Sequence, residues 1–181
     1  MIEAKQRSVL KDKSDVELAI RLIKHGARMN MLEQETSISY ERMIKLYKEV
    51  AGKSPAKGQL PFSTEWFLVW QPQIHSSLFL NIYDGFVKSC DINEIDALIK
   101  AYEMYLEHTS RCNIKVVVLT ITRAWLLIKF MENRMLERMK CNHCKGQFIA
   151  DAYENKKGYV CCLCNPPARA GKTTQPEAHE C

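Results

Sequence analysis

The sequence predicts a mainly α-helical protein, a multi-helix domain followed by a small cysteine-rich module with a short β-hairpin. Three observations support this fold class. Apolar residues recur at helical spacing through most of the first 140 positions, positive charge is in excess near the N-terminus, and six of the eight cysteines lie within residues 141–181. The chain therefore divides into a helical part and a part in which cysteine has a special role.

Length and composition are those of an ordinary globular chain. The 181 residues are 46% hydrophobic and 26% charged, with a net charge of +5, and only seven Gly and six Pro argue against a collagen-like or broadly disordered chain. The charged N-terminus has no apolar signal segment, so we expect a cytoplasmic protein with free thiols rather than disulfides. The longest apolar run, 116–131, contains Arg123 and Lys129 and predicts a buried helix rather than a membrane span.

Three helices are predicted in the N-terminal segment, residues 1–58. The first begins near Val16 with Ser14 or Asp15 as its N-cap and stops at Gly26, and the second covers about 27–35. After the polar break 36–39, Ser39 can cap a third helix over 40–50 that Gly52 ends. The breaker-rich loop 51–58 then separates this segment from the rest of the chain.

The segment 59–140 is predicted to form the helical core and to bind a partner. Large rings crowd residues 60–86, where Pro72 divides two helices and Ser63 or Thr64 caps the first. Asp91 and Glu94 resemble a capping box for a helix with apolar residues on one stripe, and a last long helix is expected over 114–139. Beyond it we expect a hairpin pairing 147–153 with 158–160, and a mobile tail over 165–181.

The cysteines of segment 141–164 form two C-x-x-C pairs separated by sixteen residues. This spacing is typical of a zinc site, with Cys141, Cys144, Cys161 and Cys164 as ligands and one Zn²⁺ per chain. Four thiolates fill a tetrahedral coordination sphere, so the expected role is structural, because binding of the metal would fold a module too small to bury its own core. The sequence thus predicts a zinc-ribbon-like module.

Other uses of these cysteines stay open at the level of sequence. An iron–sulfur cluster also takes four thiolates, although paired turns joined by a hairpin favour zinc. A redox C-x-x-C pair would need a parallel βαβ pattern, which is absent from the sequence pattern. Cys162 or His143 could replace a neighbouring ligand, whereas Cys90 and Cys112 are interpreted as core thiols and Cys181 as a tail thiol.

The positive charge is concentrated in the N-terminal third. Residues 1–60 hold 12 Lys and Arg against 8 Asp and Glu, residues 61–140 hold 9 of each, and residues 141–181 hold 5 against 4. A basic helix, a short break and a capped helix suggest a helix-turn-helix, whose second helix enters the DNA major groove. An alternative is that these cations are the solvated face of an ordinary helical bundle.

The helix-turn-helix interpretation assigns a role to each cation. The first turn of the second helix would face DNA bases through Tyr40 and Arg42, with Glu41 between them. The phosphate contacts would come from the flanking cations, which are Arg28, Lys45, Lys48, Lys53 and Lys57.

Several blocks of sequence, in the same order, resemble the FlhC family of flagellar transcriptional activators of proteobacteria. They are LPFSTEWF at 60–67, IKLYKE at 44–49, IKAY at 99–102, LTITRAW at 119–125 and CCLCNPPARA at 161–170. The resemblance covers about residues 16–170 and places the family's four zinc cysteines on the same four positions that the spacing selects.

The resemblance also implies partners and a task. FlhC-like proteins join FlhD in a hetero-hexamer of two FlhC and four FlhD chains, bind DNA upstream of flagellar operons, and activate transcription with the sigma-70 RNA polymerase. The chain is thus expected to be a DNA-binding activator subunit and no enzyme. Two other functions are weighed against it: a zinc-stabilised interaction subunit whose partner supplies most DNA contacts, and a thiol oxidoreductase.

Overall fold

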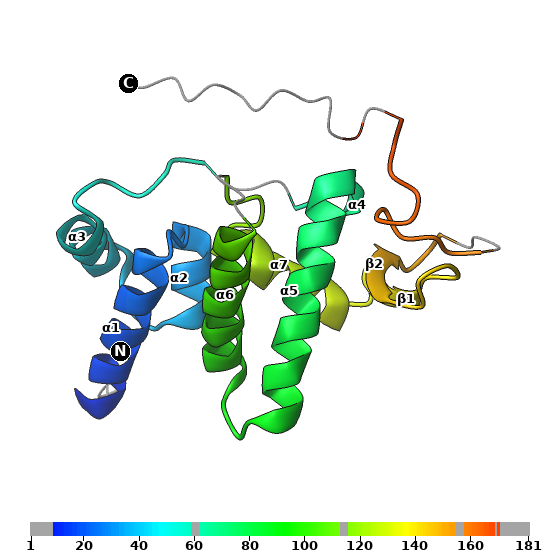
Figure 1. Cartoon of the computed structure of the whole chain (residues 1–181). Coiled ribbons are helices and arrows are strands. Elements are labelled where there is room, and N and C mark those ends of the chain that lie inside the picture. Colours follow the sequence, from blue (N-terminus) through cyan, green and yellow to red (C-terminus); the bar gives the residue numbers. More distant parts are fainter. Residues whose placement is uncertain (1–8, 59–61, 113–115, 155–157, 169, 171–181) are drawn as a thin grey trace.

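The computed structural model describes residues 9–58, 62–112, 116–154, 158–168 and 170. Across these ranges seven helices are followed by a two-stranded antiparallel sheet, which confirms the predicted fold class. Figure 1 shows α1 (Val9–Lys24), α2 (Met29–Glu35) and α3 (Tyr40–Ala51) at one end of the molecule and the strands at the other, with the remaining helices between them. The tail beyond residue 170 and Cys181 lie outside the described residues.

Helix α1 begins earlier than its apolar pattern predicts. It already includes Val9, so Ser14 and Asp15 lie inside the helix and neither is its N-cap. Charged residues extend the helix because they are good helix formers, and Lys13 pairs with Glu17 one turn later at 3.7 Å. The Asp15 carboxylate instead accepts a hydrogen bond from the Ser37 N–H at 3.0 Å, which ties α1 to the turn before α3.

The turn between α2 and α3 is held by local hydrogen bonds and one buried side chain. Thr36 closes α2 because both its N–H and its hydroxyl donate to the Leu32 carbonyl, at 3.0 and 2.8 Å. Ile38 is buried in the core, and α3 buries Met43 and Tyr47 below its exposed face. Gly52 then ends α3 at a φ of +67°, as predicted, donating to the Lys48 carbonyl.

The central helices are α4 (Glu65–Leu68), α5 (Trp70–Ser89), α6 (Glu94–Arg111) and α7 (Ile121–Glu132). The break between α4 and α5 falls at Val69, and Pro72 lies in the first turn of α5, where its missing N–H breaks no helical hydrogen bond. The N-cap of α6 is Asn93, whose side chain accepts from the Asp96 N–H at 2.8 Å, so the predicted cap at Asp91 is wrong.

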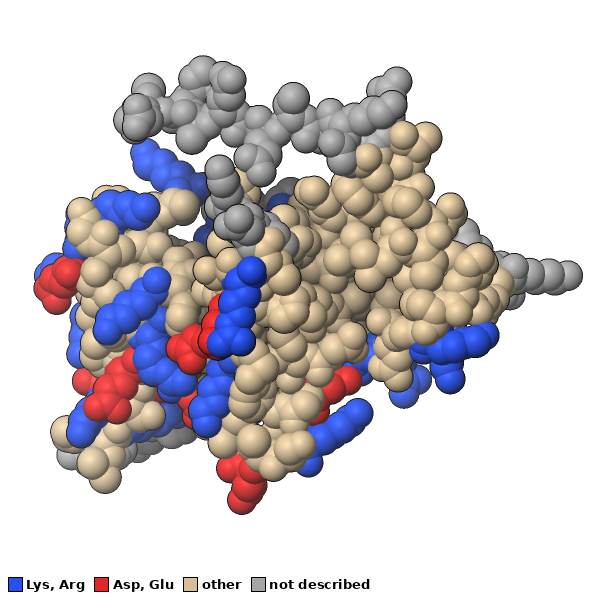
Figure 2. All heavy atoms as spheres, viewed as in Figure 1, with Lys and Arg blue, Asp and Glu red and all other residues tan. Residues whose placement is uncertain are grey.

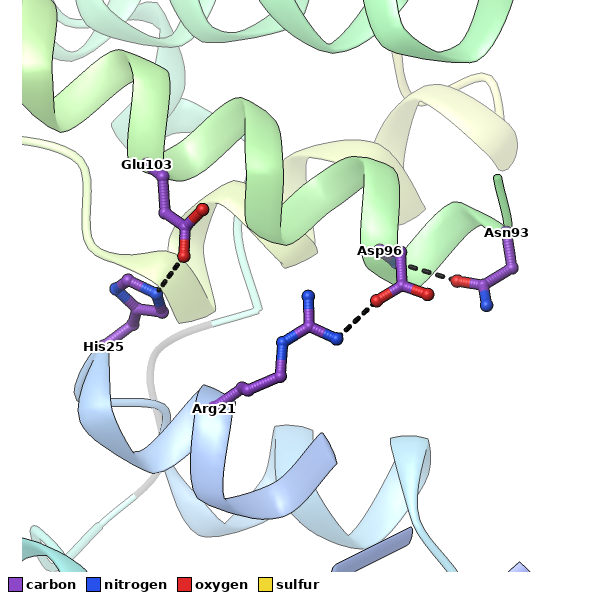
Figure 3. Close-up of polar contacts among 5 residues, drawn as sticks. All are labelled: Arg21, His25, Asn93, Asp96 and Glu103. Carbon is purple, nitrogen blue, oxygen red and sulfur yellow. Dashed lines mark hydrogen bonds and ion pairs between the residues drawn. The ribbon is translucent and has the colours of Figure 1, made fainter. Parts of the chain in front are cut away.

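Contacts of different kinds join α1 to α6, as Figure 3 shows. Arg21 of α1 pairs with Asp96 at 2.5 Å, and His25 lies 3.2 Å from the Glu103 carboxylate. The ring of His25 also meets Tyr102 edge to face. Beneath these exposed groups, Leu22 and Ile23 are buried in the main core, which supplies most of the binding energy between the helices.

The C-terminal hairpin differs from the predicted one. Helix α7 ends at Glu132 rather than near 139, and a turn with Arg134 at a φ of +55° leads into β1 (Leu136–Lys140). Strand β1 pairs with β2 (Gln147–Asp151), so the partner of β2 precedes the first cysteine pair and is not segment 158–160. Leu136 and Met139 are three residues apart, a spacing typical of one face of a helix, whereas in β1 they contact different hydrophobic clusters, which explains the error.

The hairpin takes part in two separate hydrophobic clusters. Leu136 and Ile149 belong to the main helical core, whereas Phe148 and Ala150 pack with Cys141 and other residues of the cysteine module. The free edge of β2 is covered by α5. Gln73 donates to the Ile149 carbonyl at 3.0 Å, and the Ser77 hydroxyl accepts from the Ile149 N–H at 3.1 Å. The helix thus satisfies backbone groups that a sheet edge would otherwise leave exposed.

Candidate metal centre and nucleic-acid interface

The four cysteines of the two C-x-x-C pairs gather at the end of the hairpin. The sulfur atoms of Cys141, Cys144, Cys161 and Cys164 all lie within 4.8 Å of one another, and those of Cys144 and Cys161 are 3.8 Å apart. A tetrahedral site with Zn–S bonds of about 2.3 Å requires sulfurs about 3.8 Å apart, whereas a disulfide requires about 2 Å. The residues therefore fit a tetrahedral thiolate-bound metal ion.

Tight turns position each pair of cysteines. The first pair lies in the loop between β1 and β2, where the Cys141 N–H donates to the Gly146 carbonyl at 2.9 Å and the Lys145 N–H returns to the Cys141 carbonyl at 3.0 Å. Lys145 has a φ of +62°, and a Cβ on Gly146 would lie 3.4 Å from the Cys144 sulfur. In the second pair, the Cys164 N–H donates to the Cys161 carbonyl at 3.0 Å.

The surroundings of the sulfurs shift their pKa values in opposite directions. The backbone N–H of Cys161, 3.4 Å from the Cys141 sulfur, is the main cause that lowers the pKa of the Cys141 thiol to about 6. The pKa of Cys164 is raised to about 12, chiefly because its thiol donates hydrogen bonds to the sulfurs of Cys144 and Cys161. Four sulfurs this close cannot all ionise together unless a cation balances their charge.

Cys162 and His143 are not part of this cluster in the described residues. Cys162 is half-buried beside it, and burial raises the pKa of its thiol. The two remaining described cysteines, Cys90 and Cys112, are exposed at the C-caps of α5 and α6, so their interpretation as core thiols is wrong. The four cysteines that the spacing selected are the ones that the structure brings together, because two matched turns must meet to complete a tetrahedron.

The predicted DNA-contacting residues of α3 lie on its outer face. Tyr40 is 58% exposed, Lys45 and Lys48 are exposed, and the following loop exposes Lys53 and Lys57. None of these four lysines has an ion pair with another residue of the described ranges. Figure 2 shows many Lys and Arg, with Asp and Glu among them, over the end of the molecule that carries α1–α3.

The two arginines of the predicted interface lie in different surroundings. Arg42 makes a two-point contact with Asp12 of α1, each nitrogen–oxygen distance being 3.1 Å, and this pairing raises the pKa of its guanidinium. Arg28 is the N-cap residue of α2, and its side chain donates to the Gly58 carbonyl at 3.2 Å. The sequence pattern could not reveal the contact with Asp12, because the two residues are thirty positions apart.

A large uncharged surface, which the sequence did not reveal, lies between the two charged ends. Figure 2 shows the region over α5 and the adjoining cysteine module almost free of Lys, Arg, Asp and Glu. A cavity of about 340 Å³ opens there between α5 and the two cysteine turns. Its apolar lining includes Ile74, Leu78, Phe148, Cys162 and Leu163.

Comparison with known proteins now identifies the family. The family model for the flagellar transcriptional activator FlhC matches residues 4–177. The chain belongs to the FlhC family. It is 53% identical over 171 residues to the flagellar transcriptional regulator FlhC of Verminephrobacter eiseniae, with 94% of this chain and 92% of the relative covered. It is 47% identical to the protein of the same name from Gallionella capsiferriformans, with 92% of each chain covered.

The relationship extends to more distant FlhC proteins and agrees with the structure. The FlhC of Proteus mirabilis is 46% identical over 167 residues, which cover 92% of this chain and 86% of the relative. Membership of FlhC makes the chain a flagellar transcriptional activator, and transcriptional regulation is not a class of enzyme activity. Among the described residues no helix is long and apolar enough to traverse a bilayer.

Proposed function

We propose that this chain is a cytoplasmic, DNA-binding activator subunit that works without catalysis of its own. It acts with an FlhD-type partner, in a complex of two such chains with four partner chains, upstream of flagellar promoters, where it stimulates the sigma-70 RNA polymerase. Membership of the FlhC family supports the regulatory role. The observation that carries DNA binding is the exposed cationic face of α3, which follows a short turn supported by α1 and α2.

The proposed DNA contacts follow this face. Tyr40 and Arg42, in the first turn of α3, contact bases, and the cations behind them contact phosphates: Arg28, Lys45, Lys48, Lys53 and Lys57. Arg42 must leave Asp12 to reach a base. Arg42 is exposed, so solvent screens this ion pair and Arg42 can exchange Asp12 for a base contact.

The four-thiol site is proposed to hold one structural zinc ion per chain. Zinc would close the two cysteine turns on each other, leaving no coordination position for water or substrate. The chain's own residues keep the sulfurs in place: Gly146 and Lys145 shape the first turn, and Phe148 and Ala150 pack behind it. The gathering of both pairs into one cluster also argues against a separate redox-active dithiol.

Two cysteines of the second turn provide a matched test of the ligands. Cys164→Ser should lower bound zinc from about one ion per chain to nearly none, because three thiolates leave the site incomplete. Cys162→Ser, two residues away, should keep the full zinc content. Metal analysis of both purified variants decides the assignment, and it is contradicted if Cys162→Ser loses the metal or if wild type carries iron instead.

The uncharged surface over α5 supports a partner-binding role, and it also favours the second candidate function. In that alternative the chain is an interaction subunit, and the FlhD-type partner supplies most DNA contacts. The apolar cavity of about 340 Å³ in the uncharged surface can accommodate apolar side chains inserted by a protein partner. Both functions use this surface, so they differ only in where DNA binds.

A gel shift with promoter DNA separates the two functions. The chain alone, its partner alone and the mixture are compared at two salt concentrations, together with a Lys45→Ala variant of the mixture. If the chain contacts DNA through α3, the variant assembles normally but binds DNA more weakly. Unchanged DNA affinity of the variant would favour the interaction subunit.

A further inference from the structure

Two half-buried arginines lie beside each other without a carboxylate partner in the described part of the chain. Arg28 precedes α2, and Arg123 lies in the first turn of α7. The Arg28 N–H donates to the Thr122 hydroxyl at 3.0 Å, which fixes the start of α2 against the residue next to Arg123. Burial, and then the charge of Arg28, lower the pKa of Arg123, so the two cations disfavour each other.

The guanidinium of Arg123 is held against an aromatic ring while its N–H groups reach solvent. Its central carbon lies 3.7 Å from the centre of the Trp66 ring, so the indole covers one of its faces. Its side-chain N–H groups donate to no acceptor of the described residues, and Arg28 uses one donor on the Gly58 carbonyl. An anion that contacts both arginines would offset the repulsion between them, and a phosphate group matches the fork of an arginine.

The surroundings favour an extended anion over a small one. Gly58 ends the loop that carries Lys53 and Lys57, and this loop continues directly from the C-terminus of α3. The arginine pair therefore lies at the end of a series of cations that begins at the proposed DNA-contacting helix. A nucleic acid backbone, with regularly spaced phosphates, can contact such a series along its length.

We propose that Arg28 and Arg123 together bind a phosphate group of the duplex DNA backbone, on the same side of the chain as α3. The proposal rests on the DNA-binding function proposed above and adds Arg123, which the sequence placed only within a buried helix. Trp66 acts as a positioning residue, because it holds the guanidinium plane and leaves its edge free for the phosphate.

The test is the salt dependence of DNA binding by the complete chain in complex with its partner. Arg123→Gln should reduce the slope of log affinity against log salt by about 1 and weaken promoter and unrelated duplexes by the same factor. Arg123→Lys, which keeps the charge, should retain most of the slope. The unfolding midpoint of Arg123→Gln should equal or exceed that of wild type, because a repelled, half-buried cation is removed.

Arg111→Gln is the matched control, because Arg111 is an exposed arginine already paired with Glu107, and it should leave the slope unchanged. An unchanged slope for Arg123→Gln, in a complex that binds DNA, would refute the phosphate contact and leave the proposed function standing. A loss confined to promoter DNA would indicate base recognition and would also refute it. If wild type binds no DNA, alone or with its partner, both proposals fail.

Discussion

The roles of individual side chains depend on contacts with residues that are far away in the sequence. The Tyr105 hydroxyl accepts a hydrogen bond from the Leu119 N–H at 3.3 Å and shares a second hydrogen bond, of 2.8 Å, with the Nδ1 atom of buried His75. A buried histidine such as His75 cannot be distinguished from a surface histidine by any local sequence pattern.

Burial lowers the pKa of His75, which makes stability depend on pH. The contribution of neutral His75 is complete above about pH 6.5, the pKa of histidine in an unfolded chain, and is lost as the pH falls from there through the lower folded-state pKa. Denaturant unfolding of wild type and His75→Gln between pH 8 and 5.5 should give a steeper fall for wild type. Protonation of the cysteine cluster affects wild type and His75→Gln equally. Coinciding curves of stability against pH would therefore show that His75 is not the source of the difference.

At the scale of elements, local signals predicted the helices well and the strands poorly. Gly52 and Ser39 marked the ends of α3 because caps depend on neighbouring residues. Strand β1 could not be predicted, because its pairing with β2 and the burial of Leu136 depend on a hairpin closed around the first cysteine pair. The gathering of Cys141, Cys144, Cys161 and Cys164 was predictable from their spacing alone.

The attachment of β2 to α5 depends on one buried amide. Gln73→Leu would leave the Ile149 carbonyl without its hydrogen bond, which costs about 1–3 kcal/mol of stability. Gln71→Leu, on the exposed side of the same helix, should change stability by less than about 0.5 kcal/mol. Urea unfolding measures both, and equal effects would show that the amide does not hold the strand.

The contact between α1 and α6 combines the polar groups of Figure 3 with buried apolar side chains, and the two kinds of group contribute very differently to stability. Leu22 is fully buried, so Leu22→Ala should cost about 2–5 kcal/mol. Arg21→Ala removes a partly exposed ion pair with Asp96 and should cost less than about 1 kcal/mol. Thermal unfolding of the two variants would contradict this ranking if Arg21 proved the more important.

At the scale of the whole molecule, charge and apolar surface are separated. Cations gather over α1–α3, whereas the surface over α5 and the cysteine module is almost uncharged (Figure 2). The sequence indicated the first feature through its N-terminal charge surplus. It could not indicate the second, because that surface combines residues from α5 with both cysteine turns.

A single substitution can charge this surface without disturbing the fold. Leu163 is 69% exposed and lines the cavity of this surface, so Leu163→Asp should fold normally and yet weaken partner binding at least tenfold. Leu10→Glu, at an exposed apolar residue of α1, should leave the affinity unchanged. Titration of each variant with the partner measures its affinity. Equal affinities would show that the partner binds elsewhere on the chain.

The hairpin links the two hydrophobic clusters, since its side chains reach both of them. Unfolding of the cysteine module therefore withdraws Leu136 and Ile149 from the helical core as well. A metal ion bound only by the folded state would add to the stability of the entire chain in proportion to the logarithm of its free concentration. Removal of such a metal would therefore lower the stability of the helices as well as that of the cysteine module.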